Sequence, residues 1–227
     1  MASRGNDVYN GAGGSVIVSG SRVWLADGGI DVVDYKAAGN TAITVNLSNT
    51  GIQNTGYGNH RYVNIEGISG ANGADTFTDN AADNVFNGRG GNDTFNLLNG
   101  GKDTLIYDLL TAADATGGNG HDQVFGFKVG TFEATPNADR IDLADLLIGY
   151  TADADGPAHY INGVATIDAG ETIGAYLSVV RSGGNTTLML DRDGAGGAYA
   201  PTALVTLNGV DVDLATLLAN HQIVIGG

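Results

Sequence analysis

Apolar residues recur along this chain in very short groups, separated by turns that are rich in Gly, Asp and Asn. Three consecutive segments within residues 70–96 read GANGADTFT, DNAADNVFN and GRGGNDTFN, a period of nine without a gap. Phe77, Phe86 and Phe95 share one phase of this period. An apolar residue flanked by polar ones predicts a short strand with one inward-pointing side chain.

A second phase lies two residues before each Phe and holds Asp75, Asn84 and Asp93. The first six residues of each unit read as a turn, in which Gly permits positive φ and close approach of the backbone. One coil cannot bury its own apolar face, so several coils must stack. We therefore predict an all-β fold, a parallel β-roll or β-helix. We expect its aspartates to line a rim and to face backbone carbonyls of neighbouring turns.

Related units occur on both sides of this run. GGNGHDQVF (117–125) is a complete match with Asp122, and NGGKDTLIY (99–107) places Asp103 in the same local relation after a slip of one residue. Upstream units are RGNDVYN (4–10) and DGGIDVVDY (27–35), whereas Val16 stands where Asp is expected in GAGGSVIVS. The array therefore predicts a repeat β-roll over residues 1–127.

The repeat lapses between residues 36 and 68, where we predict a wider, irregular coil. In AITVNLSNTG (42–51), alternating Ile43, Val45 and Leu47 indicate a strand, and RYVNIEGI (61–68) is read as another.

Glycine repeats fade after residue 127, and residues 128–227 are interpreted as a β-rich cap that carries short helices. A hairpin is predicted within 175–194, and Asp213 is the expected N-cap of a short helix. The other elements expected here are a strand that ends in a helical turn (138–150), a strand (203–210), the helix (212–221) and an apolar strand-like tail, QIVIGG.

Composition adds charge to this picture. Gly accounts for 37 of 227 residues, the net charge is −15, and all but three of the 25 acidic residues are Asp. So many carboxylates repel one another unless cations neutralise them, and they disfavour nucleic acid, whose phosphates require Lys and Arg. There is no Cys, so another clamp such as a metal ion is expected. The first residues lack an apolar signal region, and we expect no transmembrane segment.

Carboxylate and carbonyl oxygens in a flexible loop form a site for a hard cation, which favours Ca²⁺. The DRDGAGG loop (191–197) adds a second kind of candidate, because Asp-x-Asp-Gly resembles part of an EF-hand loop. His121 falls at a variable repeat position and is expected to be solvated. The candidate metal-binding residues are Asp7, Gly29, Asp31, Gly73, Asp75, Asn84, Gly88, Gly90, Asp93, Gly101, Asp103, Gly117, Gly118, Gly120, Asp122, Asp191 and Asp193.

The nonapeptide resembles the calcium-binding repeat of RTX proteins. Together with DRIDLADLLIGY, TTLMLDRDGAGG and VDLATLLANHQIVI, it makes the chain similar to the C-terminal region of large Bap-like RTX adhesins. This resemblance implies a module of a secreted protein that supports adhesion and biofilms at the surface of Gram-negative bacteria. It also implies type I secretion through an ABC transporter, an adaptor and an outer-membrane channel. We expect a monomeric module of a longer chain.

Motifs of catalysis are missing from the sequence. There is no His-Glu-x-x-His, Gly-x-Ser-x-Gly or Gly-x4-Gly-Lys, and the four His residues are scattered. We therefore expect no enzymatic activity in this chain. Two alternatives stay open: the secretion tail of an RTX hydrolase, and a self-associating, surface-layer-like structural module.

Overall fold

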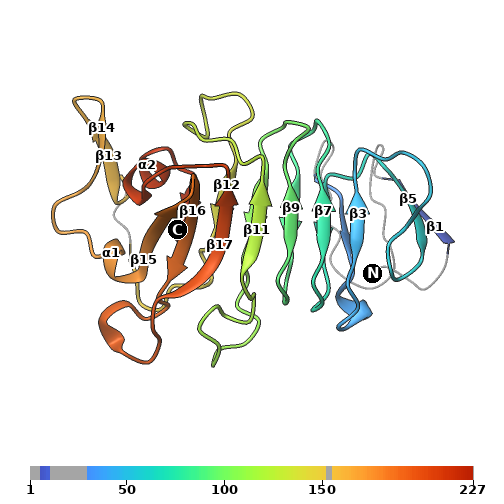
Figure 1. Ribbon diagram of the computed structural model, residues 1–227, viewed down its shortest axis with the longest axis horizontal. Helices are drawn as coiled ribbons and strands as arrows, with labels where there is room; N and C mark the ends of the chain where they lie inside the picture. The colour runs from blue at the N-terminus through green and yellow to red at the C-terminus, as the bar shows by residue number, and fades with distance from the viewer. Residues whose placement is uncertain (1–5, 11–29, 152–154, 227) are drawn as a thin grey trace.

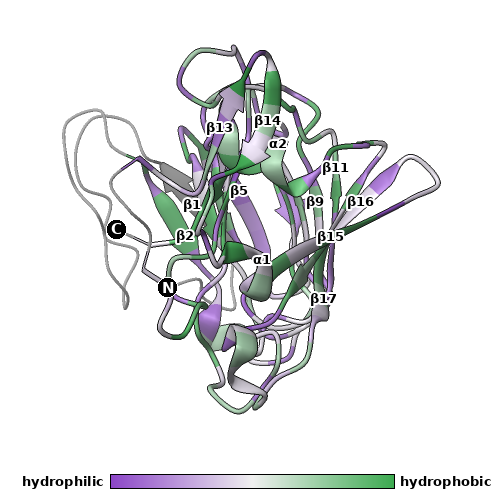
Figure 2. Cartoon of the chain, turned by 90° about the vertical axis from the view of Figure 1, so that its left-hand side faces the viewer, coloured by the Kyte–Doolittle hydropathy of each residue, from purple (hydrophilic) through white to green (hydrophobic). Residues whose placement is uncertain are grey.

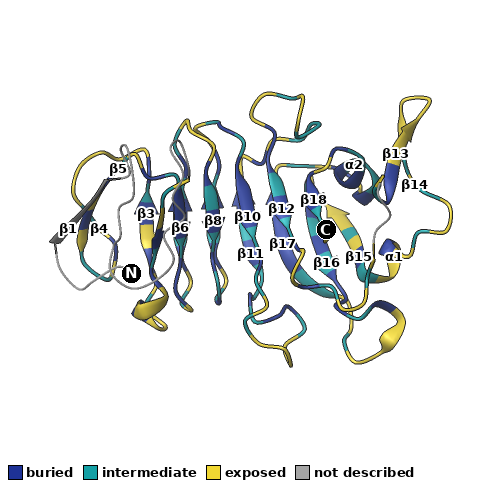
Figure 3. Ribbon diagram, turned by 180° about the vertical axis from the view of Figure 1, so that it is seen from behind, coloured by how far each residue is buried: buried dark blue, intermediate teal, exposed yellow. Residues whose placement is uncertain are grey.

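The computed structural model describes residues 6–10, 30–151 and 155–226. Two long sheets of mostly parallel, short strands face each other along the molecule, one visible in Figure 1 and the other from behind in Figure 3. The first consists of β2 (Val32–Asp34), β6 (Gly67–Ser69), β8 (Val85–Asn87), β10 (Thr104–Ile106), β12 (Arg140–Asp142) and β18 (Ile223–Val224). The second consists of β3 (Thr44–Asn46), β7 (Thr76–Thr78), β9 (Thr94–Asn96), β11 (Asp122–Phe125), β15 (Leu177–Ser182), β16 (Asn185–Leu190) and β17 (Thr202–Asn208).

The nine-residue period explains this arrangement. Each unit contributes one three-residue strand, and successive units alternate between the two sheets. Phe77 therefore pairs in register with Phe95 in one sheet, while Ile68 pairs with Phe86 in the other. Two units make one full coil, and the chain winds as a parallel roll of the kind that the repeat predicted. Viewed along the stack, β2 and β11 lie on opposite sides of the interior (Figure 2).

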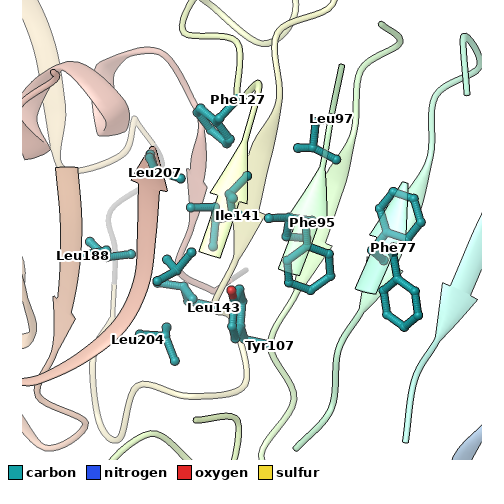
Figure 4. Close-up of a cluster of buried hydrophobic side chains, with 14 of the residues drawn as sticks. Phe77, Phe95, Leu97, Tyr107, Phe127, Ile141, Leu143, Leu188, Leu204 and Leu207 are labelled. Atoms are coloured by element: carbon teal, nitrogen blue, oxygen red, sulfur yellow. The ribbon is translucent and has the colours of Figure 1, made fainter. Parts of the chain in front are cut away.

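The core is the space between the sheets, filled by the inward residue of each strand. Phe77 and Phe86 stack with ring centroids 5.8 Å apart, and Phe95 lies 6.2 Å from Phe86. All three are fully buried. Ile141 and Leu207 continue the same core toward the C-terminal end (Figure 4). The predicted phase of inward Phe residues is thus confirmed.

The lapse in the repeat holds additional structure. Ile43, Val45 and Leu47 are buried around β3, as predicted. The expected strand at 61–68 is wrong, because Asn64 adopts a left-handed φ of 51° and divides it. Its first half is β5 (Asn59–Val63), which forms a separate sheet with β1 (Asn6–Asn10) and β4 (Gln53–Asn54), and its second half begins β6. A 3-10 turn, η1 (Lys36–Ala38), precedes β3.

The C-terminal part changes strand direction without leaving the sheet. β17 pairs parallel with β11 on one side and antiparallel with β16 on the other, and β16 pairs antiparallel with β15. The repeat strands therefore share the two long sheets with five strands that follow residue 127: β12, β15, β16, β17 and β18. The hairpin, the strand at 203–210 and the tail strand are confirmed. Helix α2 (Leu214–Ala219) is confirmed too, with Asp213 accepting the Thr216 N–H at 2.7 Å.

Four further elements complete this end. The hairpin of β13 (Ala158–Ile161) and β14 (Val164–Ile167) was not anticipated; it projects beside α2 (Figure 1). Its turn is Asn162-Gly163, and both residues have positive φ, which is typical of a type I′ turn. Helix α1 (Ile173–Tyr176) leads into β15, and η2 (Gly194–Gly196) lies between β16 and β17.

Candidate functional site

Aspartates form a buried row where the strands of the seven-stranded sheet begin. Asp75, Asp93 and Asp122 are at most 1% exposed. Asp93 Oδ1 accepts the Asp75 N–H at 2.7 Å, and Asp122 Oδ1 accepts the Asp93 N–H at 2.7 Å. The row continues to Asp75 Oδ1, which accepts the Ile43 N–H at 2.7 Å. Each carboxylate therefore ties its own coil to the preceding one.

A second row lies on the six-stranded sheet. Asp103 Oδ1 accepts the Asn84 N–H at 2.9 Å, and Asp139 Oδ1 accepts the Asp103 N–H at 3.0 Å. Nearer the N-terminus, Glu66 Oε2 accepts the Asp31 N–H at 3.1 Å. The two rows follow one rule, in which the acidic residue of one coil binds the backbone of the coil before it.

These partners differ from those expected. We predicted that the carboxylates would face backbone carbonyls, but their Oδ1 atoms accept backbone N–H groups. The N–H at the start of each short strand needs an acceptor when it is buried, and the carboxylate of the next coil supplies it. This arrangement uses one oxygen of each carboxylate and leaves the other for a second partner.

The second oxygen distinguishes Asp93 from its neighbours. Asp75 Oδ2 accepts the Ala71 N–H at 2.7 Å, and Asp139 Oδ2 accepts the Lys128 N–H at 2.8 Å. Asp93 Oδ2 is buried and has no hydrogen-bond partner among the described residues. A Cβ at Gly88 would overlap this oxygen, so the repeat glycine leaves room for the carboxylate. A buried, unpartnered carboxylate oxygen is costly unless a ligand completes it.

Glycines bring the backbone of adjacent turns close to these carboxylates. A Cβ at Gly120 would overlap the Gly91 carbonyl, and a Cβ at Gly91 would overlap the Gly73 carbonyl. Gly91 and Gly120 also have φ of 127° and 80°, which disfavour other residues. Arg89, which replaces a repeat glycine, adopts φ of 66°, and its N–H donates to Asn87 Oδ1 at 2.8 Å.

Burial makes these carboxylates resist ionisation. It raises the pKa of Asp93 to about 9, and the nearby Asp122 and Asp75 charges add to the shift. It raises the pKa of Asp103 to about 8, with Asp139 contributing. The pKa of Asp122 rises to about 7 and that of Asp75 to about 6, again mainly through burial. Like charges in a row thus oppose one another in the folded protein.

The donor set suits a hard cation. In residues 30–151 and 155–226, no three His, Cys, Asp or Glu side chains gather into a metal-binding cluster. The carboxylates form rows instead, and the glycines beside them let carbonyls of adjacent turns approach closely. Calcium accepts carboxylate and carbonyl oxygens together in flexible loops. The unpartnered Asp93 Oδ2 and the glycine turns therefore fit this ion.

Other candidates are placed apart from the rows. Asp7 lies in β1, where it pairs in register with His60 in the separate sheet, and Gly29 lies outside the described residues. Asp191 and Asp193 lie in the connection between β16 and β17. Six of the glycines lie in turns that precede the row residues: Gly73, Gly88, Gly90, Gly101, Gly118 and Gly120. Gly117, which opens the turn before Asp122, packs beside Leu146.

Sequence reasoning missed Asp139 and Glu66, which extend the second row. Asp139 stands two residues before the buried Ile141, the same relation that links Asp75 to Phe77, but the long loop after Phe127 hides the nine-residue count. Glu66 holds the same relation to Ile68. His121, expected to be solvated, is half-buried instead, and its Nε2 lies 2.9 Å from Thr206 Oγ1 of β17.

A scan against protein-family models and a search of curated proteins found no match to this chain. Among the described residues, none of the helices has the length and apolar character that crossing a membrane requires.

Proposed function

We propose that this chain is a calcium-binding β-roll module whose repeat coils are stabilised when calcium binds along the two acidic rows. The observation that carries this proposal is the fully buried Asp75–Asp93–Asp122 row with its unpartnered Asp93 Oδ2. Asp103 and Asp139 would act in the second row, with carbonyls of the glycine turns as further oxygen donors. Calcium would supply the positive charge that these carboxylates lack.

The physical consequence is a link between binding and folding. Buried carboxylates without a counter-charge oppose the folded state, and a cation that binds only the folded coils removes this penalty. Binding free energy then becomes folding free energy. Extracellular calcium modules work at about 10⁻⁴–10⁻³ M calcium. The coils would therefore stay unfolded at a low calcium concentration and would fold at the higher calcium concentration outside the cell.

The biological setting that we propose is the C-terminal end of a secreted RTX adhesin. Support comes from the nonapeptide repeat and from the resemblance of the last ninety or so residues. In this setting a type I channel passes the chain in an extended state, and calcium drives folding on the far side. The module would serve export and folding at the bacterial surface and would carry no catalysis.

The test is a calcium titration of the full chain after chelation, followed by circular dichroism. We expect β-structure and melting temperature to rise cooperatively with calcium. Asp93→Asn should raise the calcium midpoint several-fold but should stabilise the chelated protein near neutral pH, because it removes a buried carboxyl group that must take up a proton, or remain charged without a counter-ion, when the chain folds. Asp145→Asn, at an exposed position, should change neither quantity. A chelated protein that is fully folded and melts at the same temperature as the calcium form would refute the proposal.

A further inference from the structure

The connection between β16 and β17 contains a buried acidic residue outside both rows. Asp191 follows the last residue of β16 and is only 8% exposed. Its N–H donates to the Tyr176 carbonyl at 2.7 Å, which fixes the start of the connection. Its side-chain Oδ1 is buried and accepts no hydrogen bond from the described residues. The carboxyl group of Asp193 lies beside that of Asp191.

The connection folds back around Asp193. Asp193 Oδ2 accepts the Ala198 N–H at 2.9 Å, and Oδ1 accepts the Tyr199 N–H at 3.2 Å. A Cβ at Gly196 would overlap Oδ2, so a side chain at this position would displace the Asp193 carboxylate. These N–H groups lower the pKa of Asp193 and keep it charged, whereas burial and the adjacent Asp193 raise the pKa of Asp191. The two carboxylates thus lie side by side, and no Lys, Arg or His of the described residues forms an ion pair with either.

The neighbouring Arg192 does not supply a counter-ion. Its side chain is 1% exposed and points into the molecule. Its guanidinium donates to the carbonyls of Ala112 and Asp114, at 2.9 Å each, and of Leu146 at 3.3 Å. Arg192 instead joins the connection to the loop after β10, which leads to the turn before Asp122. A ligand at Asp191 would therefore brace the same loop that enters the first row.

We propose that Asp191 and Asp193 form a separate calcium site in the β16–β17 connection. The buried, unpartnered Asp191 Oδ1 points to a missing ligand, and Asp193 fixes the second carboxylate beside it. Both carboxylates offer oxygen only, which suits calcium rather than zinc. This site shares no ligand with the repeat rows, because it uses no repeat residue and lies at the end of an antiparallel strand.

The test counts bound calcium ions in the full chain by calorimetry and by metal analysis at fixed free calcium. Asp191→Asn should lose one ion per chain, and Asp145→Asn should lose none. In the chelated protein, Asp191→Asn should leave the melting temperature equal or higher, since it relieves repulsion with Asp193. In saturating calcium it should lower that temperature.

The outcomes separate this site from the rows. Loss of one ion in Asp191→Asn while Asp93→Asn keeps every ion would support this site and count against the rows. If Asp191→Asn binds as many ions as the unmodified chain, or loses equal stability with and without calcium, Asp191 has only a structural role and the site is refuted.

Discussion

The repeat coils of residues 67–106 alternate between the two long sheets, and the antiparallel part of residues 177–208 extends one of them, but the two regions fill the interior differently. Strands in the coils are three residues long, and their interior combines a Phe stack with buried carboxylates. The antiparallel strands are six or seven residues long and contain no acidic residue. Leu188, Leu190 and Leu204 form their core.

Under the proposed calcium binding, this difference places the cation-dependent part of the fold in the coils. In the coils, turns make up most of each unit, and the strand-start N–H groups rely on carboxylates from the next coil. Stability in such an array comes from contacts between neighbouring repeats. The antiparallel strands satisfy their backbone through a two-residue turn, Gly183-Gly184, and longer ladders. We therefore expect calcium and pH to act mainly on the coils.

The largest expected effect is the pH dependence of the coils without metal. Burial raises the pKa of Asp93 from 3.8 to about 9 and that of Asp103 to about 8. The folded coils then bind more protons than the unfolded chain, so stability falls as the pH rises from about 4 to about 9. At about 1.4 kcal/mol per pKa unit, Asp93 alone loses roughly 4 kcal/mol between pH 5 and pH 8.

Hydrogen exchange with mass spectrometry in a chelator checks this expectation region by region. Amides of β7–β10 should be protected at pH 5 and open at pH 8, after correction for the intrinsic exchange rate. Those of β16 and β17 should change less. With saturating calcium the coils should be protected at pH 8, because ligating carboxylates are deprotonated. An equal change of protection in β7–β10 and in β16 and β17 would contradict the expected difference between the coils and the antiparallel part.

An intermediate effect is expected from the aromatic stack. Phe86→Ala removes a fully buried ring that stacks on Phe77, so it should lower the free energy of unfolding in calcium by about 3–5 kcal/mol. Because each coil relies on its neighbours, protection should be lost across β6–β10 together. Urea denaturation and hydrogen exchange measure the two effects. Leu188→Ala is the matched change in the antiparallel part and should leave the protection of β6–β8 intact. A loss confined to β8 in Phe86→Ala would contradict the coupling.

The sequence predicted much of the coil region for a physical reason. A strict period of nine places the residues equivalent to Asp75 and Phe77 at the same point of the turn and strand in each unit. Local spacing therefore determines the fold of this region. The carboxylate partners were not predictable in this way, because they depend on how adjacent coils stack. Asp139 was not predicted, because the long loop before it interrupts the count of nine residues. The β13–β14 hairpin was missed although its Asn162-Gly163 turn carries a clear signal.

The C-terminal elements were predicted where one local interaction decides them. Asp213 was recognised as an N-cap from its place before an apolar helix, and its side chain does accept the Thr216 N–H. The pairing of β17 with both β11 and β16 could not be inferred, because nothing in either strand specifies a change from parallel to antiparallel neighbours.

The smallest expected effect comes from this N-cap. Because the cap lies outside the coils, it tests whether the C-terminal part is independent of calcium. Asp213→Ala removes the acceptor of the Thr216 N–H and should cost about 1 kcal/mol of stability, the usual value of a helix cap. Since α2 lies outside the acidic rows, the loss should be the same at every calcium concentration at which the coils are folded. Asp145→Ala should show no measurable loss. Urea denaturation at two calcium concentrations measures this loss of stability. A loss that grows as the calcium concentration falls would show that α2 and the coils unfold as one cation-dependent unit.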